Sequence, residues 1–494
     1  MTRVRTTAAV AASKLASAAT RVTRRGGGTA LPGLVAERLD PRVVANLGRT
    51  LGRGRVVVTG TNGKTTTSRI MAAAFDAAGV PYIHNREGSN LMRGMASTLT
   101  TAAGVSGAIH NARATAGLFE TDEATMPAAV AAIKPRVIVF TNLFRDQLDR
   151  YGEVDTVAGL WRAALQAAPR DCTLVLNADD PSVAEMAVGW SGPVHWFGLD
   201  DPTFATDARG AFDARWCSCG GDYAYERRYF AHIGIWRCTN CDRARPPLDT
   251  SGSSVTLGLD SATMNIDQWQ DAEFGTASGR ERSMPEQDSS TLSTSLPVPG
   301  SLSPTSMPLT GLYNVYNALA AIAACRAFGL PEEATRAGLA AVRPAFGRQE
   351  VVQFEGRRLR LFLAKNPAGA NQVLLLLREI ARERPPLKLA LFLNDRFADG
   401  QDVSWIWDVD YELLRDSAGA WWAGGDRAED LAVRLKYAGW PRASIVDHDP
   451  SSILNAILGA TVAGDDIFVI PTYTAMLDLR EELARRGAVA GRLE

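Results

Sequence analysis

The chain has 494 residues, of which 46% are hydrophobic and 22% charged, and its formal net charge is −1. This length allows two or three domains with their own cores, and the composition is that of a globular protein, not of a fibrous or membrane-spanning one. The near-zero charge gives no overall electrostatic attraction to nucleic acid, although it leaves room for a local basic patch.

The first thirty residues form a basic segment that contains no acidic residue. This composition fits a transit peptide, a frayed terminus or a basic helix that lies near an anionic membrane, and we favour the helix. The segment has no continuous apolar run, which argues against a signal peptide or a transmembrane anchor. We therefore assign residues 1–40 to a basic N-terminal helix or extension.

A glycine-rich turn between an apolar strand and a helix, within "RVVVTGTNGKTTTSRIMAAAF" from Arg55, carries the clearest chemistry. Glycines and a helix N-terminus expose backbone N–H groups to anionic oxygens, Lys64 can reach terminal phosphates, and the Thr65 hydroxyl can ligate magnesium. Val58 stands where the general phosphate-loop pattern has glycine, so the turn is a shorter variant. It predicts ATP or GTP bound by Gly60, Thr61, Asn62, Gly63, Lys64, Thr65 and Thr66.

Apolar runs recur after this turn, with helical stretches between them, at residues 136–140, 172–177 and 194–198. Strands that alternate with helices indicate a mainly parallel sheet covered on both faces. A helix follows at 311–329. We expect a central α/β domain over residues 41–345.

A second alternating series begins beyond residue 346, with the strand-like runs "RLRLFLA", "KLALFLN", "ASIVDH" and "DIFVIPT". It predicts a smaller α/β domain over residues 346–494, joined to the first near residue 346.

Four of the six cysteines cluster, which favours a metal site in a reducing, cytoplasmic compartment over a disulfide framework. Two close pairs at ribbon spacing suit tetrahedral zinc, because thiolates are its preferred structural ligands. The first pair has a C-x-C spacing, one residue shorter than usual, so reduced metal-free cysteines stay an alternative. The predicted ligands are Cys217, Cys219, Cys238 and Cys241, with His195 and His232 as spare candidates.

The cysteines define a zinc-ribbon-like insertion over residues 214–246. The Ser-, Thr- and Pro-rich stretch that follows predicts a flexible insertion over residues 250–308.

Several motifs in fixed order resemble the Mur ligase superfamily, whose members join a carboxylate to an amine through an acyl phosphate made with ATP. The motifs are "GTNGKTT" at 60–66, "FETDEA" at 119–124, "TNLFRDQLDRYG" at 141–152, "LNADDP" at 176–181, "GLYNVYNALAA" at 311–321 and "FGRQE" at 346–350. The resemblance implies a Mur ligase-type ATP-binding domain with catalytic Lys64 and magnesium at Thr65 and Glu120. It also places Asn314 and Asn317 near the adenine and adds Arg348 to the nucleotide-binding residues.

Departures from the classical pattern indicate a branch of the superfamily. About fifty residues precede the loop, too few for the domain that holds a UDP-sugar in classical members, and "AKNPAG" at 364–369 replaces their usual run. With "GSNLMRGMAST" and "PTYTAMLDLR", the chain resembles the ligase subunits of lipid II isoglutaminyl synthases. This implies amidation of the D-isoglutamate α-carboxylate in the lipid II stem peptide, with ammonia from a GatD-type glutamine amidotransferase partner, at the inner membrane surface.

The two remaining cysteines, Cys172 and Cys325, lie in apolar contexts with no histidine nearby in sequence. A glutaminase needs a cysteine paired with a histidine, so we interpret both as core residues and expect the chain not to hydrolyse glutamine alone.

The segment "DVSWIWDVD", residues 402–410, is interpreted through the same resemblance. In such complexes the ligase subunit lends an aspartate to the partner's Cys-His pair, and we choose Asp408 first and Asp402 second. The two tryptophans would anchor the partner; the alternative is that they are core residues and the acids simply face solvent.

Two competing functions stay open at this point. A zinc ribbon beside an ATPase is also found in proteins that handle nucleic acid, which the lack of a basic excess disfavours. Within the ligases, the alternative is a Mur-type enzyme that adds an amino acid, such as a folylpolyglutamate or UDP-muramoyl peptide synthetase.

Overall fold

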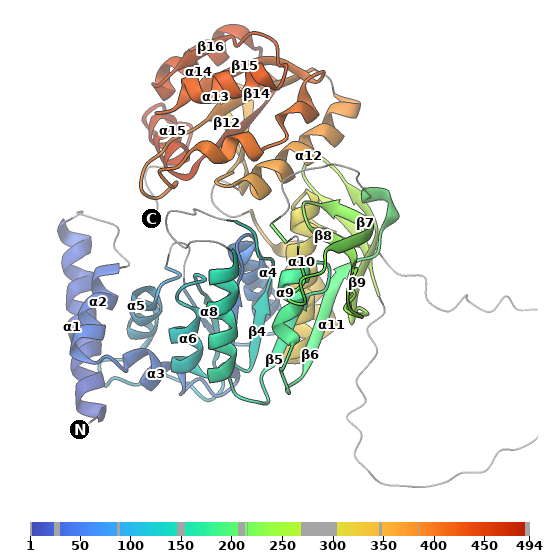
Figure 1. The fold of residues 1–494 in the computed structure, drawn as a ribbon. Coiled ribbons are helices and arrows are strands. Elements are labelled where there is room, and N and C mark those ends of the chain that lie inside the picture. The colour runs from blue at the N-terminus through green and yellow to red at the C-terminus, as the bar shows by residue number, and fades with distance from the viewer. Residues whose placement is uncertain are drawn as a thin grey trace, which may run out of the picture.

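The computed structural model describes residues 2–23, 30–85, 89–145, 154–205, 213–214, 216–267, 304–344, 348–384 and 386–489. None of the helices within these ranges is long and apolar enough to cross a membrane. The described residues form a nine-stranded sheet, a six-stranded sheet and a two-stranded hairpin. Figure 1 shows the two larger sheets in separate domains, one above the other, each with its own helices.

The nine-stranded sheet forms the central domain, and its neighbouring strands are parallel from β2 across to β9 and antiparallel from β9 to β11. Its central strands are buried at all positions except Arg55, because helices cover both faces, and this explains their apolar runs. In spatial order the strands are β11 (Thr305–Met307), β10 (Ala262–Ile266), β9 (Thr250–Leu257), β6 (Val194–Leu199), β5 (Thr173–Asn177), β4 (Val137–Phe140), β1 (Gly54–Thr59), β3 (Ala116–Glu120) and β2 (Tyr82–His84).

Two hydrophobic cores lie on the two faces of this sheet. Val56 and Val58 of β1 point into one core, whereas Val57 between them points into the other, as the alternation of a strand requires. The first core contains α4 (Lys64–Ala77), α10 (Leu312–Phe328) and α11 (Glu332–Ala341); the second contains α3 (Val43–Gly48), α5 (Met92–Ala102), α6 (Met126–Ile133) and α8 (Val154–Ala167).

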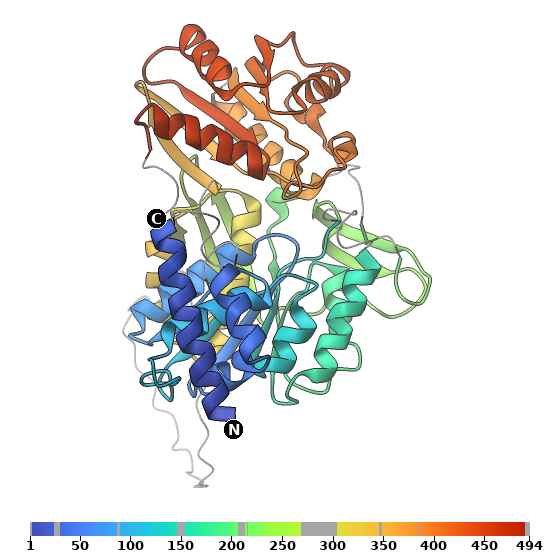
Figure 2. The ribbon, with the colours of Figure 1, turned by 90° about the vertical axis from the view of Figure 1, so that its left-hand side faces the viewer.

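The N-terminal segment forms the helix that the sequence predicts. Figure 2 shows α1 (Thr2–Thr23) and α2 (Ala30–Leu39) side by side on the outside of the central domain. Ala9 and Val10 of α1 are fully buried, and the Ser13 hydroxyl lies 2.7 Å from that of Thr100 on α5. The helix is therefore part of the domain's packing, and its proximity to a membrane stays a prediction.

The cysteine-bearing insertion is an antiparallel hairpin of β7 (Tyr223–Phe230) and β8 (Ile233–Cys238) that leaves the sheet after β6. This confirms the predicted ribbon-like segment.

The predicted flexible insertion over 250–308 is wrong at both of its ends, where β9, β10 and β11 continue the central sheet. Alternate residues of β10, namely Ala262, Met264 and Ile266, are buried in the core. This period of two was hidden by the Ser- and Thr-rich composition. Residues 268–303 lie outside the described part of the chain, as does the end of the predicted motif at 146–152.

The second α/β domain is confirmed as a six-stranded sheet, parallel except at the edge strand β12. The predicted join at residue 346 falls on 345–347, outside the described residues. The strands, in spatial order, are β12 (Arg348–Phe354), β13 (Arg357–Phe362), β17 (Asp466–Pro471), β14 (Leu387–Phe392), β15 (Ala418–Gly424) and β16 (Ile445–Asp447). One face is covered by α12 (Pro367–Glu383), α13 (Ala428–Tyr437) and the short η4 (Tyr411–Leu414), the other by α14 (Pro450–Ala460) and α15 (Tyr473–Arg485).

Candidate active site and metal centre

The predicted phosphate loop joins the carboxyl end of β1 to the N-terminus of α4. Gly60 and Gly63 adopt positive φ angles of 137° and 88°, which residues with a side chain rarely adopt. A Cβ on Gly60 would lie 2.0 Å from the Thr141 hydroxyl, and one on Gly63 would lie 1.9 Å from the Asn317 amide oxygen. The close approach of these two side chains explains why the turn needs glycines at both positions. The N-terminus of α4 directs backbone N–H groups into the turn, which favours a bound anion.

Lys64 lies in the first turn of α4, with its ammonium buried between the loop and the end of β3. It donates to the carbonyl of Thr61 at 3.2 Å and to the carboxylate of Glu123 at 2.9 Å. Burial opposes its charge, but Glu123 beside it, aided by Glu120 and Asp122, outweighs burial and raises the pKa of Lys64. The lysine is thus held as a cation at the mouth of the loop. Sequence reasoning did not single out Glu123, although it lies within the predicted acidic motif.

The two predicted magnesium ligands are brought together. The Thr65 hydroxyl donates to a carboxylate oxygen of Glu120 at 3.1 Å. Glu120 ends β3, which pairs with β1 so that Glu120 stands opposite Val58, just before the loop. The backbone N–H of Glu120 donates to Asn85, which fixes the strand end. A hydroxyl and a carboxylate offer the hard oxygen ligands that magnesium prefers, so the donor set fits the ion.

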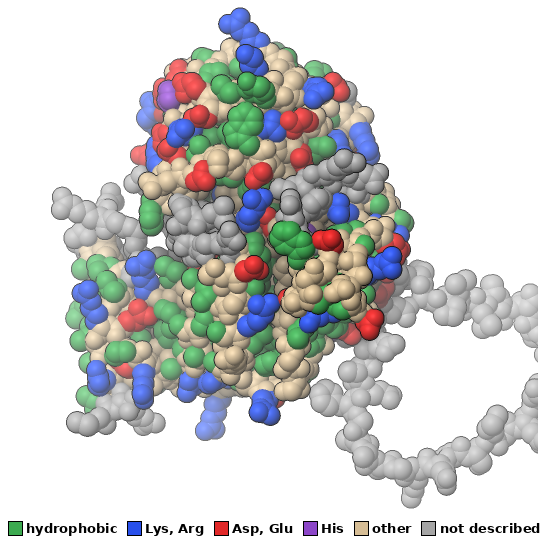
Figure 3. All heavy atoms as spheres, in the orientation of Figure 1, with side chains coloured by type: hydrophobic (Ala, Val, Ile, Leu, Met, Phe, Trp, Pro, Cys, Tyr) green, Lys and Arg blue, Asp and Glu red, His purple; other side chains and the backbone are tan. Residues whose placement is uncertain are grey.

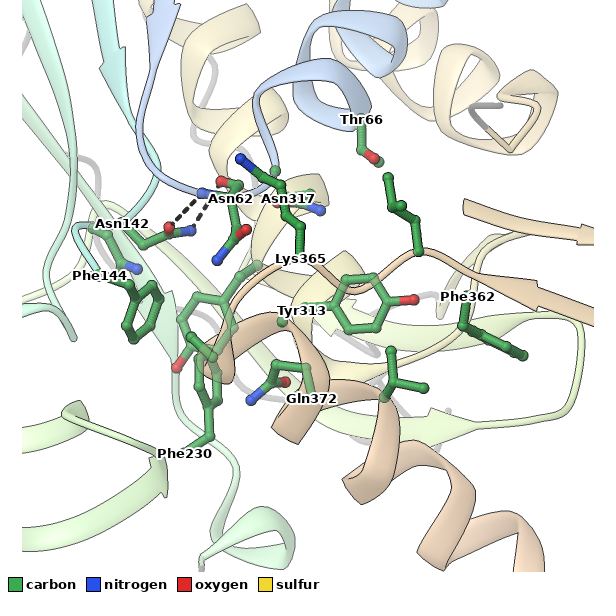
Figure 4. Close-up of a pocket in the computed structure, with 17 residues that line it drawn as sticks. Asn62, Thr66, Asn142, Phe144, Phe230, Tyr313, Asn317, Phe362, Lys365 and Gln372 are labelled. Atoms are coloured by element: carbon green, nitrogen blue, oxygen red, sulfur yellow. Dashed lines mark hydrogen bonds between the residues drawn. The ribbon is translucent and has the colours of Figure 1, made fainter. Parts of the chain in front are cut away.

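A pocket opens between the loop and the second domain, and Figure 4 shows its lining residues pointing toward a common space. One wall is the loop, another is aromatic, and a third comes from the second domain. The residues in these three walls are, respectively, Asn62, Gly63 and Thr66; Phe144, Phe230, Tyr313 and Tyr316; and Phe362, Lys365 and Gln372. Asn142 closes the loop side by exchanging two hydrogen bonds with the backbone of Asn62.

The two predicted adenine-side asparagines on α10 take different positions. Asn317 lines the pocket, and its amide donates to the side-chain oxygen of Asn314 at 3.1 Å. Asn314 is not among the lining residues; it donates in turn to the carbonyl of Thr310 and holds Asn317 in place. Arg348 begins β12, but its side chain lies outside the described part of the structure.

The four predicted cysteine ligands converge at the open end of the β7–β8 hairpin, with all four sulfur atoms within 4.8 Å of one another. The Sγ atoms of Cys217 and Cys241 are 3.8 Å apart, and those of Cys219 and Cys238 are 3.4 Å apart. Four thiolates around zinc at about 2.3 Å would be separated by about 3.8 Å. The cluster therefore fits tetrahedral zinc, and the short C-x-C spacing does not prevent it.

The remaining cysteines and the spare histidines have other surroundings. Cys172 and Cys325 are fully buried in the two cores of the central domain, and burial raises the pKa of each thiol to about 12. Both are core residues, as predicted. His195 lies 2.9 Å from the Thr250 hydroxyl, and His232 is buried at the hairpin tip, 3.4 Å from Asp180. Neither histidine belongs to the cysteine cluster.

Of the two predicted aspartates, Asp402 precedes a short 3-10 helix of the second domain, η3 (Ser404–Asp408), and Asp408 is its last residue. The side chain of Asp408 is 43% exposed, and its carboxylate lies 3.3 Å from the guanidinium of Arg145 in the central domain. Asp402 is exposed and accepts from the backbone N–H of Ser404 at 2.8 Å. The Ser404 side chain, and then this N–H, lower the pKa of Asp402 by hydrogen bonding to its carboxylate. Neither lines the nucleotide pocket.

Both domains match models of known protein families. The Mur ligase middle domain model matches residues 58–215, and the MurT ligase C-terminal model matches residues 363–476. A pseudomurein peptide ligase type C from Methanothermus fervidus has a similar fold, with a TM-score of 0.60 at 19% identity over 88% of this chain and 79% of that one. A phosphate loop, a neighbouring acidic strand end and a second α/β domain across the pocket thus make this chain a Mur-type ligase.

Two relatives extend the likeness to almost the full length. The MurT subunit of the glutamine-hydrolysing lipid II isoglutaminyl synthase of Streptococcus pneumoniae is 32% identical over 95% of each chain. The same subunit of Staphylococcus aureus is 30% identical over 97% of each chain. The chain belongs to the MurT family of Mur-type ligases.

Proposed function

We propose that this chain is the ligase subunit of a glutamine-hydrolysing lipid II isoglutaminyl synthase, which converts D-isoglutamate in the lipid II stem peptide to D-isoglutamine. The observation that carries the proposal is the full-length likeness to two MurT subunits of such synthases, together with a phosphate loop that faces the second domain. The basic helix α1 is compatible with a position of the enzyme beside an anionic membrane.

The reaction proceeds in two steps at the loop. A carboxylate oxygen of the substrate attacks the γ-phosphorus of ATP, so that ADP leaves and an acyl phosphate forms. Ammonia then attacks the acyl carbon, the carbon–oxygen bond to phosphate breaks, and the amide and inorganic phosphate are released, with the lost proton passing to solvent.

The residues of the loop favour the first step by neutralising charge. Both the transferring phosphoryl group and the developing oxyanion are negative, and Lys64 is a buried cation at this position. Magnesium held by Thr65 and Glu120 would add positive charge on the phosphate oxygens. Bound phosphates would compete with Glu123 for the ammonium of Lys64.

The ammonia is supplied by a glutamine amidotransferase subunit, to whose Cys-His pair Asp408 lends its carboxylate. Asp408 stands at the surface beside two exposed aromatic side chains, Trp407 and Tyr437, whose rings are 5.7 Å apart. Figure 3 shows hydrophobic side chains among charged ones on the face of the second domain that is turned to the viewer. A carboxylate on the partner's imidazole would fix its tautomer and stabilise the imidazolium. That imidazole would replace Arg145 as the partner of Asp408.

The test is mass spectrometry of lipid II after incubation with ATP, magnesium and either glutamine or ammonium salt. The full complex should amidate with both nitrogen sources, and this chain alone should amidate with ammonium only. Incorporation of an amino acid in place of ammonia would instead identify an amino-acid-adding ligase, and nucleic acid retained on purification would reopen the nucleic-acid alternative.

A further inference from the structure

The N-terminal helix α1 has two apolar sides, and only one of them is buried. On the inner side, Ala9 and Val10 pack into the central domain. On the outer side, exposed apolar residues recur every three or four positions, which is the period of one helix face. The largest of them, Val4 and Leu15, are 74% and 73% exposed. An apolar row of this length on a helix indicates a surface that another body covers. The row consists of Val4, Ala8, Ala11, Leu15 and Ala18.

Two neighbouring segments add exposed apolar side chains beside this row. Leu39 at the end of α2 is 44% exposed, and its carbonyl accepts from the guanidinium of Arg5 at 3.4 Å. Val105 in the loop after α5 is 78% exposed, and the carbonyl of Ser106 next to it accepts from the Thr7 hydroxyl at 3.1 Å. Because Arg5 and Thr7 belong to α1, both segments lie against that helix. We call the row, together with Leu39 and Val105, the apolar face.

The charged residues around the apolar face are mainly basic. Residues 1–54 contain ten Lys and Arg but only two Asp and Glu, although the whole chain has a formal net charge of −1. Both acids are withdrawn from the surface, since Asp40 is 4% exposed and Glu37 is partly buried, whereas Arg5 and Arg38 are exposed. Figure 3 shows hydrophobic and basic side chains together on the surface over α1 and α2, at the left of the molecule. The face is therefore complementary to a body that is negative at its surface and apolar beneath it.

We propose that the apolar face lies on an anionic lipid bilayer, with its aliphatic side chains among the lipid tails and the surrounding Arg and Lys at the headgroups. Protein interfaces are typically built around aromatic anchors, whereas this face is aliphatic, so a bilayer fits it better than a protein partner does. The inference goes beyond the proposed reaction and rests on the proposed function only in that the substrate is lipid-linked.

Helix α5 connects the apolar face to the candidate active site. Near the end of α5, the Thr100 hydroxyl lies 2.7 Å from that of Ser13 on α1. Just before α5 begins, the carbonyl of Asn90 accepts from the backbone N–H of Asp122, in the acidic motif beside the phosphate loop. The helix has 11 residues and is therefore about 16 Å long. A bilayer at the apolar face would thus hold lipid-linked substrates within one short helix of the acidic motif.

The experiment is co-sedimentation of the full-length chain with vesicles of phosphatidylcholine, either alone or mixed with an equal part of phosphatidylglycerol. The chain should bind the mixed vesicles more tightly, and added salt should release it, because the bases act through their charge. The double variant Val4→Glu/Leu15→Glu should bind the mixed vesicles about tenfold more weakly, since carboxylates resist entry into the apolar layer. The matched control is Val188→Glu/Val462→Glu, at two exposed valines outside the face, and it should bind as the unsubstituted chain does.

Thermal unfolding checks that the variants fold, and Val4→Ala/Leu15→Ala provides a neutral truncation that should also weaken vesicle binding. The inference is overturned if the unsubstituted chain does not bind the mixed vesicles, or if the face variants bind them as tightly as the control does. It is also overturned if the face variants change only self-association or binding of the amidotransferase subunit, which light scattering detects.

Amidation of lipid II with ammonium tests the proposed function separately. The Val4→Glu/Leu15→Glu chain should amidate lipid II in detergent at the rate of the unsubstituted chain and be slower only when lipid II is in vesicles. If the unsubstituted chain amidates lipid II in neither form, the proposed function fails, and vesicle binding still decides the role of the apolar face.

Discussion

At the scale of single residues, the phosphate loop depends on one buried cation. The Lys64 ammonium is the loop's own positive charge and is not part of a hydrophobic core. Replacing Lys64 by Ala should lower ATP-dependent amidation by about 10²- to 10³-fold while the chain keeps its fold, because the phosphoryl charge loses its main counter-ion. Amide formation from ATP and ammonium measures the effect, and circular dichroism checks the fold. Lys388→Ala, at a surface ion pair with Asp465, is the control; a folded Lys64→Ala chain that kept most of its activity would refute the proposed role of the loop.

A second prediction concerns His84, on the short strand β2. Burial, and then the nearby charge of Arg69, lowers its pKa to about 4. Between about pH 6.5 and 4 the unfolded chain binds a proton that the folded chain does not, so stability should fall as the pH drops through this window and stay level above it. Urea unfolding midpoints at several pH values test this. His84→Gln should flatten the profile; an unchanged slope would assign the acid sensitivity to other groups.

The sequence identifies the residues of the loop but not those of the opposite wall. Gly60 to Thr66 form one continuous motif whose conformation is set locally by glycines and a helix start. Phe230 and Gln372 belong to a hairpin and a helix in different domains, and only the tertiary fold brings them together. No local pattern marks either residue: a phenylalanine at a strand end and a glutamine in an amphipathic helix both have ordinary structural explanations.

At the scale of elements, burial decides which strands can be predicted. β4, β5, β14 and β17 consist mainly of apolar residues that are buried on both faces, so their sequences are recognisable without the fold. The strands β9 and β10 contain Ser, Thr and Gly at positions that range from buried to exposed, and their composition wrongly predicts a flexible stretch. Their place in the sheet depends on the pairing of β9 with β6 and of β10 with β9, which composition does not reveal.

The cysteine hairpin yields a prediction of metal content. We expect about one zinc per chain, held by four thiolates that leave no open position for a substrate. Elemental analysis of protein purified without added metal tests this. Cys219→Ser should lower the zinc content, whereas Cys172→Ala, which alters a buried core thiol outside the cluster, should not. Absence of zinc together with four freely titratable thiols would contradict the assignment.

The same hairpin links the metal centre to the nucleotide pocket. In its register Tyr223 pairs with Cys238 near the cluster and Phe230 pairs with Ile233 at the pocket, so one rigid ribbon spans both. Removing zinc with a chelator, followed by restoring magnesium, should therefore weaken ATP binding, as measured by calorimetry. If ATP binds as before, the metal does not stabilise the pocket end of the hairpin.

At the scale of the whole molecule, the two domains meet through polar contacts around the pocket. Asn366, which caps α12, donates to the side chain of Asn62 in the loop at 3.3 Å. Five residues further along α12, Asn371 accepts from the backbone N–H of Asp410 at 2.7 Å and donates to the carbonyl of Asp408 at 3.4 Å. A single helix thus connects the nucleotide loop to the segment proposed to serve the partner. The relative placement of the two domains could not be predicted from the sequence, since contacts such as that between Asn366 and Asn62 join residues far apart in the chain.

The last prediction separates the two proposed reactions by their nitrogen source. Asp408→Asn removes the carboxylate offered to the partner's imidazole but keeps the size of the side chain, and Asp408 does not line the nucleotide pocket. Glutamine-dependent amidation by the full complex should therefore fall strongly, while amidation driven by added ammonium should persist. Asp416→Asn, at an exposed acid of the same domain, should affect neither.

The other possible outcomes of this experiment would each indicate a different role for Asp408. The backbone N–H of Ser404 already donates to Asp402, so Asp402→Asn is expected to have the smaller effect; a selective loss in that variant alone would move the role to Asp402. Equal loss with both nitrogen sources in Asp408→Asn would mean that its ion pair with Arg145 supports the ligase site through the domain contact. No loss with either source would show that this ion pair and this carboxylate serve neither reaction.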